Sequence, residues 1–226
     1  MSASLCEDIA QVRRKLQRTS KKRVLFLDET AVRVSETATR TLVLEGEQPF
    51  VEATDTTSYA ARYDMIACCS IDRTFPPIIY APNERGKGIT KDMLLSYIRD
   101  VLAQAVGALD RYPLTLIIDR STIHNPAEML QEFHDWGCQE LKEILLMPSQ
   151  SAKRLSPLDN SLFHDWKERM RKHAPLTKHN IQRVMADAWN ALPARLLRSH
   201  YKHCGFMRGK DVYYDCPAPA AHRHSS

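Results

Sequence analysis

The chain has 226 residues, a formal net charge of +5 and 43% hydrophobic residues, a composition typical of a globular protein with one well-packed domain. No apolar run approaches the roughly 20 residues that a membrane-spanning helix needs, so no membrane association is expected. The first residues show no basic stretch followed by an apolar one, and no secretory signal is expected either. The six cysteines form no CxxC pair, which favours reduced thiols in an intracellular protein over a disulfide framework.

The charge is divided unevenly along the chain. Residues 1–150 carry 18 Lys and Arg against 21 Asp and Glu, whereas residues 151–210 carry 13 against 4. A strongly positive segment indicates a surface for a polyanion such as nucleic acid. A solvated helical face rich in lysine and arginine is the alternative that composition leaves open.

Hydrophobic periodicity predicts an amphipathic helix over residues 4–20, followed by three consecutive strands and then by helices that alternate with two further strands. The first strands are expected at 24–28, 39–45 and 63–71, with 77–81 as an extension of the third. The later elements are a helix from Thr90 or Lys91, a strand at 114–119, a helix near 126–136, a strand at 141–147, and helices from about Pro157, from Thr177 and over 194–203.

This order of elements predicts an α/β fold. Three consecutive strands favour an antiparallel meander, and the helical crossovers that follow favour parallel additions to it. A mixed five-stranded sheet flanked by helices satisfies both conditions.

Three acidic residues follow apolar runs. Asp28 closes Val-Leu-Phe-Leu, Asp119 closes Leu-Thr-Leu-Ile-Ile, and Asp159 opens a helical pattern. A desolvated carboxylate must be paired, neutralised or bound to a metal. Because neighbouring parallel strands end at the same edge of a sheet, Asp28 and Asp119 can converge there, and a helix packed on that edge can bring Asp159 to them.

Carboxylate oxygens are the ligands that Mg²⁺ and Mn²⁺ prefer, so the three acids predict a divalent metal site. Two ions roughly 3.5–4 Å apart, bridged by a shared aspartate, would serve phosphodiester chemistry. The alternative is that Asp28 and Asp119 only cap strand ends, or pair with Arg23 or Arg120.

The motifs around these acids resemble those of mariner-type transposases and related insertion-sequence enzymes. They read Val-Leu-Phe-Leu-Asp28-Glu29-Thr30, then Leu-Ile-Ile-Asp119-Arg-Ser-Thr-Ile-His124-Asn125, then Leu155-Ser-Pro-Leu-Asp159-Asn160-Ser-Leu-Phe. The resemblance covers about residues 20–205. It implies the catalytic domain of a DDE superfamily endonuclease, in an Asp-Asp-Asp form, with a ribonuclease-H-like fold.

The resemblance also implies roles for the three acids. Asp28, Asp119 and Asp159 would be the catalytic residues and the ligands of two Mg²⁺ or Mn²⁺ ions. The reaction would be strand cleavage by water, followed by strand transfer from the freed 3′-hydroxyl.

Residues around the acids complete the predicted site. Glu29 is a candidate to orient water or a basic side chain behind the ligands, with a solvent-facing loop acid as the alternative, and His124 is expected to be a hydrogen-bonding residue beside the site. Arg120 stands where the family often has Asn, and a cation there could hold DNA phosphate or quench the site. The predicted DNA-binding residues are Arg120, Lys153, Arg154, Lys167, Arg171 and Lys172.

The predicted domain organisation is a linker helix at 1–20, the catalytic domain at 21–205, and a disordered tail at 206–226. Only 27 residues precede Asp28, so the helix-turn-helix domains that normally lie upstream in the family are not expected in this chain. The chain is interpreted as a catalytic-domain fragment, a decayed element or a derived host protein.

The expected partners are double-stranded DNA, as transposon ends and target, and a second copy of the chain in a homodimer. The expected location is the nucleus in a eukaryote, or the cytoplasm and nucleoid in a bacterium. Two other functions stay open: a catalytically inactive DNA-binding protein derived from a transposase, and a nuclease acting on RNA–DNA hybrids.

Overall fold

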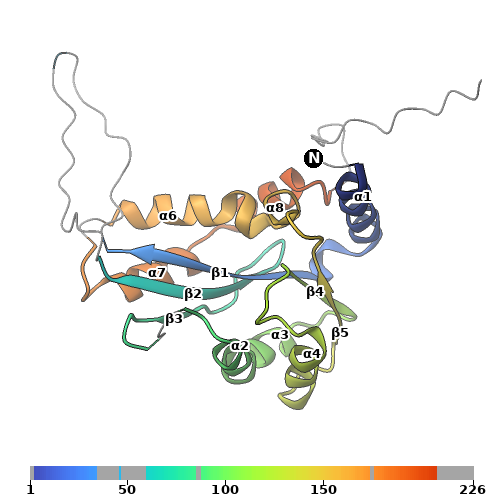
Figure 1. Cartoon of the computed structure of the whole chain (residues 1–226), viewed down its shortest axis with the longest axis horizontal. Coiled ribbons are helices and arrows are strands. Elements are labelled where there is room, and N and C mark those ends of the chain that lie inside the picture. The colour runs from blue at the N-terminus through green and yellow to red at the C-terminus, as the bar shows by residue number, and fades with distance from the viewer. Residues whose placement is uncertain (1–2, 35–45, 47–59, 85–87, 174–175, 208–226) are drawn as a thin grey trace, which may run out of the picture.

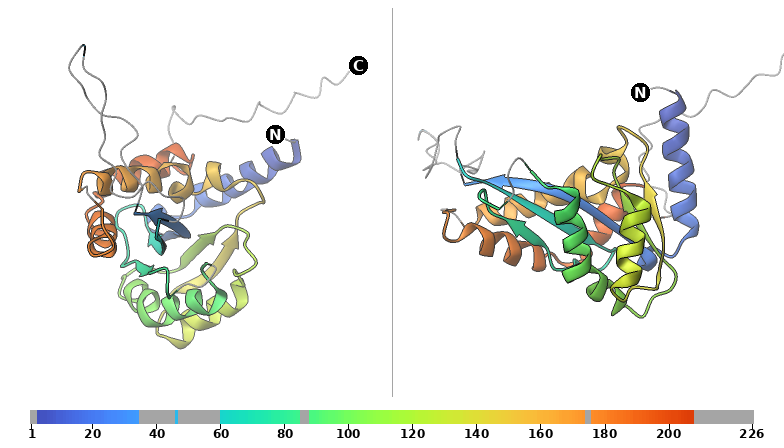
Figure 2. Two further views of the ribbon diagram at one scale, coloured as in Figure 1. Left: turned by 60° about the vertical axis from the view of Figure 1, so that its left-hand side comes forward. Right: turned by 60° about the horizontal axis from the view of Figure 1, so that its bottom comes forward.

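A mixed five-stranded sheet lies between two layers of helices in the computed structural model, which describes residues 3–34, 46, 60–84, 88–173 and 176–207 (Figures 1 and 2). The strands are β1 (Val24–Arg33), β2 (Arg62–Cys69), β3 (Ile78–Tyr80), β4 (Leu114–Ile118) and β5 (Leu141–Leu146). The α-helices are α1 (Ala3–Arg18), α2 (Lys91–Tyr97), α3 (Ala103–Gly107), α4 (Pro126–Asp135), α5 (Ala152–Leu155), α6 (Phe163–Arg171), α7 (Ile181–Asn190) and α8 (Ala194–His203). Shorter helical turns are the 3₁₀ turn η1 (Lys21–Arg23) and the π-turns η2 (Ile98–Leu102) and η3 (Leu158–Leu162).

The sheet has the order β3-β2-β1-β4-β5, with β1 at its centre. Strand β1 pairs antiparallel with β2 and parallel with β4, while β3 is antiparallel to β2 and β5 is parallel to β4. The meander followed by helical crossovers is therefore the arrangement that the order of elements predicted. The prediction of a mixed five-stranded sheet flanked by helices is confirmed.

Each face of the sheet has its own core, because successive side chains of a strand point to opposite faces. Val24 and Phe26 of β1 belong to the core beneath α1, α6, α7 and α8. Leu25 and Leu27 belong to the core beneath α2, α3 and α4. The near-continuous apolar run at the start of β1 is thus the pattern of a strand covered on both sides.

Two strand predictions need correction. Strand β1 does not end at Asp28 but continues to Arg33, because its second half pairs with β2. Residues 77–81 do not extend the preceding strand. A turn closed by the Ser70 N–H and the Arg73 carbonyl (2.8 Å) reverses the chain, so that β3 folds back antiparallel on β2. The strand predicted at 39–45 lies outside the described residues.

Two predictions about helices also differ from the structure. The helix expected to start at Thr177 starts at Ile181, because the Thr177 N–H donates to the Asn180 side chain (2.8 Å) and a turn precedes the helix. The helix expected near 126–136 ends at Asp135, and Trp136, whose large apolar ring would favour a core position, is 47% exposed beneath the guanidinium of Arg99. In the described ranges no helix is both long and apolar enough to cross a membrane.

Helix α1 packs against the domain rather than projecting from it. Its Ile9 and Leu16 are fully buried in the core that α6 and α8 cover. Arg13 is also buried, and its guanidinium donates to the carbonyl oxygens of Cys204 (3.0 Å) and Arg154 (3.3 Å). One side chain of α1 therefore joins the end of α8 to α5, the short helix that precedes Asp159.

We expect Arg13→Ala to lower the free energy of unfolding by about 1.5–3 kcal/mol, because a buried charged donor is removed from two carbonyl oxygens. Thermal or urea unfolding measures the change. Arg14→Ala is the matched control, since Arg14 is the exposed neighbour in the same helix. Equal losses of stability in the two variants would contradict the anchoring role of Arg13.

Candidate active site

Asp28 is a buried acid in the central strand, 5% exposed. Alternation along β1 places its side chain on the same face as Phe26, beneath the layer of α6 and α8. Its Oδ1 accepts the backbone N–H of Glu29 (2.8 Å), whereas its Oδ2 is buried without a hydrogen-bond partner. An ionised carboxylate in this position is costly unless a cation or a proton compensates it.

Asp119 is brought to Asp28 by the parallel pairing of β1 and β4. The paired residues run from Val24 opposite Thr115 to Phe26 opposite Ile117. Continuing this register by two residues sets Asp28 opposite Asp119, which directly follows the last residue of β4. The register of the two parallel strands therefore brings Asp28 and Asp119 together as predicted. Only Asp119 lies at a strand end, since β1 continues past Asp28.

Asp159 reaches the same place from η3, the π-turn that leads into α6. Its backbone N–H donates to Ser156 Oγ (3.2 Å), and its carboxyl lies near enough to that of Asp28 for each to shift the pKa of the other. The structure thus brings all three predicted acids into one electrostatic cluster.

The pKa of Asp28 shows how strongly the acids interact. Burial raises this pKa well above the ordinary value, and the charges of Asp159, Glu29 and Asp119 raise it further. Asp159 is partly exposed to solvent, and the loss of water around its carboxyl is the largest cause of its raised pKa. Asp119 and Glu29 add to this rise, while Asp28 and Lys153 oppose it.

Glu29 and His124 form a clamp behind Asp119. Next to Asp28 in the strand, Glu29 points to the opposite face of the sheet, where its Oε1 lies 3.0 Å from His124 Nε2. His124 Nδ1 lies 3.0 Å from the Asp119 carbonyl oxygen and 2.9 Å from Asp119 Oδ1. Glu29 is therefore not the solvent-facing loop acid of the alternative interpretation, and His124 makes the hydrogen bonds that its position predicted.

The ring of His124 is a cation in this arrangement. A carbonyl oxygen and a carboxylate can only accept, so both ring nitrogens must donate. Burial opposes the charge, but the hydrogen bonds to Asp119 and Glu29 outweigh it and raise the pKa of His124 to about 10. Glu29, Asp119 and His124 are close enough together to suggest a metal site. A doubly protonated imidazole has no lone pair for a metal, so we interpret this group as an ion-paired clamp.

The basic residues predicted to bind DNA lie at different distances from the acids. Lys153 is near enough to Asp159 to lower its pKa. Arg120 is exposed, and its Nε donates to the Met147 carbonyl oxygen (3.3 Å) rather than to an acid of the cluster. Arg154 is half-buried, and its carbonyl oxygen accepts from Arg13.

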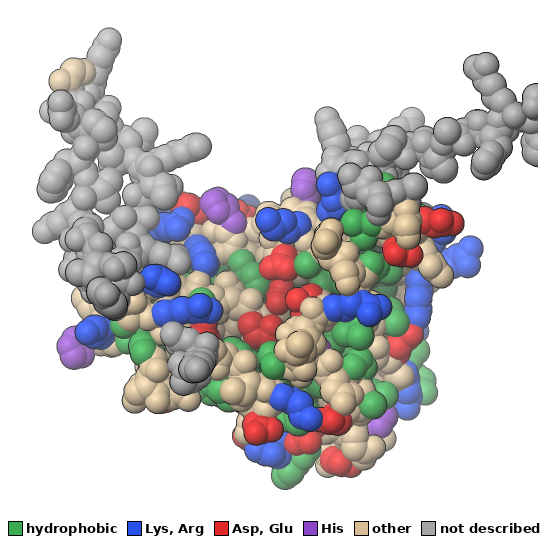
Figure 3. All heavy atoms as spheres, viewed as in Figure 1, with side chains coloured by type: hydrophobic (Ala, Val, Ile, Leu, Met, Phe, Trp, Pro, Cys, Tyr) green, Lys and Arg blue, Asp and Glu red, His purple; other side chains and the backbone are tan. Residues whose placement is uncertain are grey.

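The other three basic residues lie farther along the same helical segment. Lys167 and Arg171 are on α6, with Arg171 paired to Glu168, and Lys172 is exposed at its end. At about 1.5 Å per residue they are on the order of 10–20 Å from Asp159. Figure 3 shows acidic side chains gathered in the middle of this face, with Lys and Arg side chains on both sides of them.

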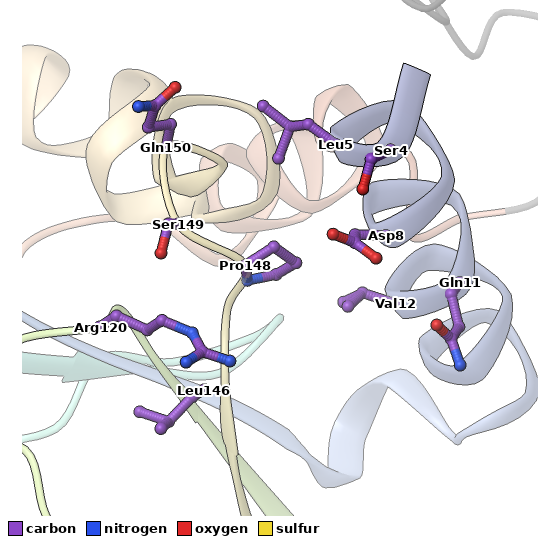
Figure 4. Close-up of a pocket in the computed structure, with 10 residues that line it drawn as sticks. All are labelled: Ser4, Leu5, Asp8, Gln11, Val12, Arg120, Leu146, Pro148, Ser149 and Gln150. Carbon is purple, nitrogen blue, oxygen red and sulfur yellow. The ribbon is translucent and has the colours of Figure 1, made fainter. Parts of the chain in front are cut away.

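A cleft of about 470 Å³ lies between α1 and the ends of β4 and β5 (Figure 4). Arg120 and Pro148 lie on one side of it, and Asp8 and Val12 of α1 lie on the other. The sequence carries no signal for this cleft, since α1 was predicted only as a linker helix. The packing of α1 on the core creates it.

The sheet order, the crossovers and the acids at the β1–β4 junction define a ribonuclease-H-like catalytic fold. The family model of the DDE superfamily endonucleases matches residues 59–197, more than half of the chain. The chain belongs to this family. No curated protein sequence matches the chain.

Solved structures of Mos1 mariner transposase share the fold. The Mos1 transposase paired-end complex with the left transposon end has a TM-score of 0.66 and 10% identity, over 91% of this chain and 62% of that one. The Mos1 paired-end complex with Mn has a TM-score of 0.63 and 10% identity, over 91% and 62%. The Mos1 catalytic domain alone has a TM-score of 0.57 and 10% identity, over 89% and 90%.

The ribonuclease-H-like fold implied by the motifs is thereby confirmed. The chain spans about 62% of the length of the transposase in the paired-end complex, and most of the length of the isolated catalytic domain.

We expect Asp28→Asn to stabilise the metal-free protein at neutral pH, because the neutral amide relieves a buried charge among three other acids. The pKa of Asp28 is raised on folding, so its ionisation penalises the folded state above the unfolded pKa. The gain should therefore shrink as the pH falls towards 4 and both states become protonated.

The measurement is the melting temperature in EDTA between pH 4 and pH 7.5, with an expected rise of about 2 °C or more at neutral pH. Asp187→Asn, at an exposed position of α7, is the control. A lower melting temperature for Asp28→Asn at pH 7.5 would refute the account of Asp28 as an uncompensated charge.

Proposed function

We propose that the chain is the metal-dependent catalytic domain of a mariner-like transposase, which cleaves DNA strands and transfers them to a target. The observation that supports this most directly is the buried Oδ2 of Asp28, which has no hydrogen-bond donor and belongs to a cluster with Asp119 and Asp159. Such an arrangement costs free energy in the absence of a cation. Family membership and the shared fold agree with the proposal.

The residues present fit a divalent cation. Asp28, Asp119 and Asp159 offer carboxylate oxygens, the donor type that Mg²⁺ and Mn²⁺ prefer, and the uncompensated charge at Asp28 is what a cation would offset. These three acids are the proposed catalytic residues and the proposed ligands of two ions. When bound in a carboxylate cluster, such ions activate a nucleophilic oxygen and stabilise the leaving oxygen. The Mos1 complex with Mn lends this proposal support.

The remaining residues of the site hold its geometry. The Glu29–His124 clamp contacts both the carbonyl oxygen and the carboxylate of Asp119, which restricts the rotation of that side chain. We assign Glu29 and His124 the role of fixing Asp119, as outer partners commonly do for metal-binding groups. Phosphodiester hydrolysis by water, and then attack by the freed 3′-hydroxyl on target DNA, are the proposed steps.

Double-stranded DNA, as transposon ends and target, is the proposed substrate. The Mos1 complex with the left transposon end supports it, as do the basic side chains on both sides of the acids in Figure 3. Arg120, Lys153, Arg154, Lys167, Arg171 and Lys172 are the proposed phosphate contacts. A homodimer is the proposed assembly. The nucleus of a eukaryote, or the cytoplasm and nucleoid of a bacterium, is the proposed place of action.

We expect the protein to nick supercoiled plasmid or pre-cleaved transposon ends when Mg²⁺ or Mn²⁺ is present, and Asp119→Asn to lower the rate more than about 100-fold. Gel separation of nicked and linear products measures the rate, and Asp187→Asn is the matched acid outside the site. If wild type and Asp119→Asn give equal background, the chain is instead a non-catalytic DNA-binding protein. A preference for RNA–DNA hybrids in the same assay would indicate a ribonuclease.

DNA affinity should depend on salt, because phosphate contacts release counterions. We expect Lys153→Ala to weaken binding to unrelated duplexes about equally, and to reduce the slope of log K against log salt by about 1. Fluorescence anisotropy between 50 and 200 mM salt measures both quantities. Lys142→Ala, exposed on β5 and packed over Tyr112, is the control. An unchanged slope would show that Lys153 does not contact DNA phosphate.

A further inference from the structure

Helix α8 lies next to two of the three acid-bearing segments, and its contacts with them are specific hydrogen bonds. The stretch matched by the family model ends at residue 197, whereas the side chains that make these bonds are His200 and Tyr201. Figure 1 shows α8 beside one end of α6, above the central strands.

On one side, α8 holds the central strands. Tyr201 is fully buried, and its hydroxyl lies 3.2 Å from the carbonyl oxygen of Val24 in β1 and 3.3 Å from that of Cys69 in β2. Its ring packs edge-on against Phe26, with centroids 5.4 Å apart. Phe26 is two residues before Asp28 and on the same face of the strand, so Tyr201 fixes the stretch that presents Asp28.

On the other side, α8 holds the segment that carries Asp159. His200 is buried, with Nδ1 hydrogen-bonded to Ser161 Oγ and Nε2 2.9 Å from Asp165 Oδ2. Ser161 lies in the same π-turn as Asp159, and Asp165 lies in the first turn of α6. Since the carboxylate of Asp165 accepts, Nε2 carries the proton, and Nδ1 accepts from the Ser161 hydroxyl. Both polar atoms of the ring are therefore used to fix this segment.

The π-turn needs such support. A π-turn departs from regular α-helical hydrogen bonding, and such turns occur mainly as single turns, often at functional sites. The N-cap residue of η3, Pro157, makes no side-chain hydrogen bond to it. Besides Ser156, which receives the N–H of Asp159, a side chain of α8 contacts the turn directly, since His200 is hydrogen-bonded to Ser161.

We propose that His200 is a positioning residue of the active site, which through Ser161 and Asp165 sets the place of Asp159 relative to Asp28, with Tyr201 holding the Asp28 side. Its part in the reaction rests on the proposed function. Residues that orient metal-binding groups from behind commonly change metal affinity or activity 10–100-fold when they are removed.

The first experiment measures nicking by the full chain as a function of Mn²⁺ concentration, at a temperature well below the melting point of every variant. His200→Ala should raise the Mn²⁺ concentration at half-maximal rate about 10-fold. Ser161→Ala should shift this concentration in the same direction. The variant with both substitutions should differ little from His200→Ala, because Ser161 acts through its contact with His200. His203 is exposed and lies three residues after His200 on α8, and the His203→Ala variant should behave as wild type.

The second experiment needs neither metal nor activity. In EDTA, Asp28→Asn and Asp159→Asn should be energetically coupled, since each relieves the repulsion that the other feels. With His200→Ala in the background, the coupling measured from melting temperatures should fall to less than half. The same double-mutant cycle on a His203→Ala background should keep its full value.

The two experiments separate the possible failures. If His200→Ala lowers the melting temperature but leaves the Mn²⁺ requirement and the Asp28–Asp159 coupling unchanged, His200 is structural only and the inference is overturned. If wild type neither nicks DNA nor responds to Mn²⁺, the proposed function fails. The coupling in EDTA then still decides whether His200 positions Asp159.

Discussion

The burial of Asp28 in the central strand is the constraint around which the rest of the site is arranged. The strand is covered on both faces, so the carboxylate has little water around it, and one of its oxygens meets no donor. Its neighbours in space are acids, and they make ionisation harder. A fold that places a charge in this way must supply compensation from outside the chain or hold a proton in the cluster. This cost is reasonable where the compensation is a metal ion needed for chemistry.

The two faces of the sheet meet this constraint differently. On the face of α2, α3 and α4, the chain supplies its own cation, since His124 is held between Glu29 and Asp119. On the face of α6 and α8, no comparable basic group is seen against Asp28 among the described residues, and neutral hydrogen bonds from α8 fix the neighbouring backbone instead. The positive charge of His124 therefore holds Asp119 in place. The carboxyl groups of Asp28 and Asp159 have no such partner in the described part of the chain and stay available to a cation.

Much of this could be predicted from the sequence, because local patterns encode it. The apolar run before Asp28 predicted a strand, and the helical crossovers after the first strands predicted the parallel pairing that brings Asp119 to it. What local patterns could not predict depends on distant partners. Strand β1 continues beyond Asp28 only because β2 pairs with it, and Trp136 is exposed because none of the described elements covers it. The roles of Arg13 and His200 were invisible for the same reason, since their partners lie far away in the chain.

Asp28 and Glu29 are neighbours in β1, so the register of this strand determines which of the two acids faces which side of the sheet. A slip of one residue against β2 would turn every side chain of the strand to the other face. The shorter acid would then meet His124, and the longer one would enter the carboxylate cluster. The net charge of the site would stay the same, but the carboxylate in the cluster would stand one methylene group farther from the backbone. The pairing from Phe26 opposite Cys69 to Arg33 opposite Arg62 therefore decides which of two neighbouring acids joins Asp119 and Asp159.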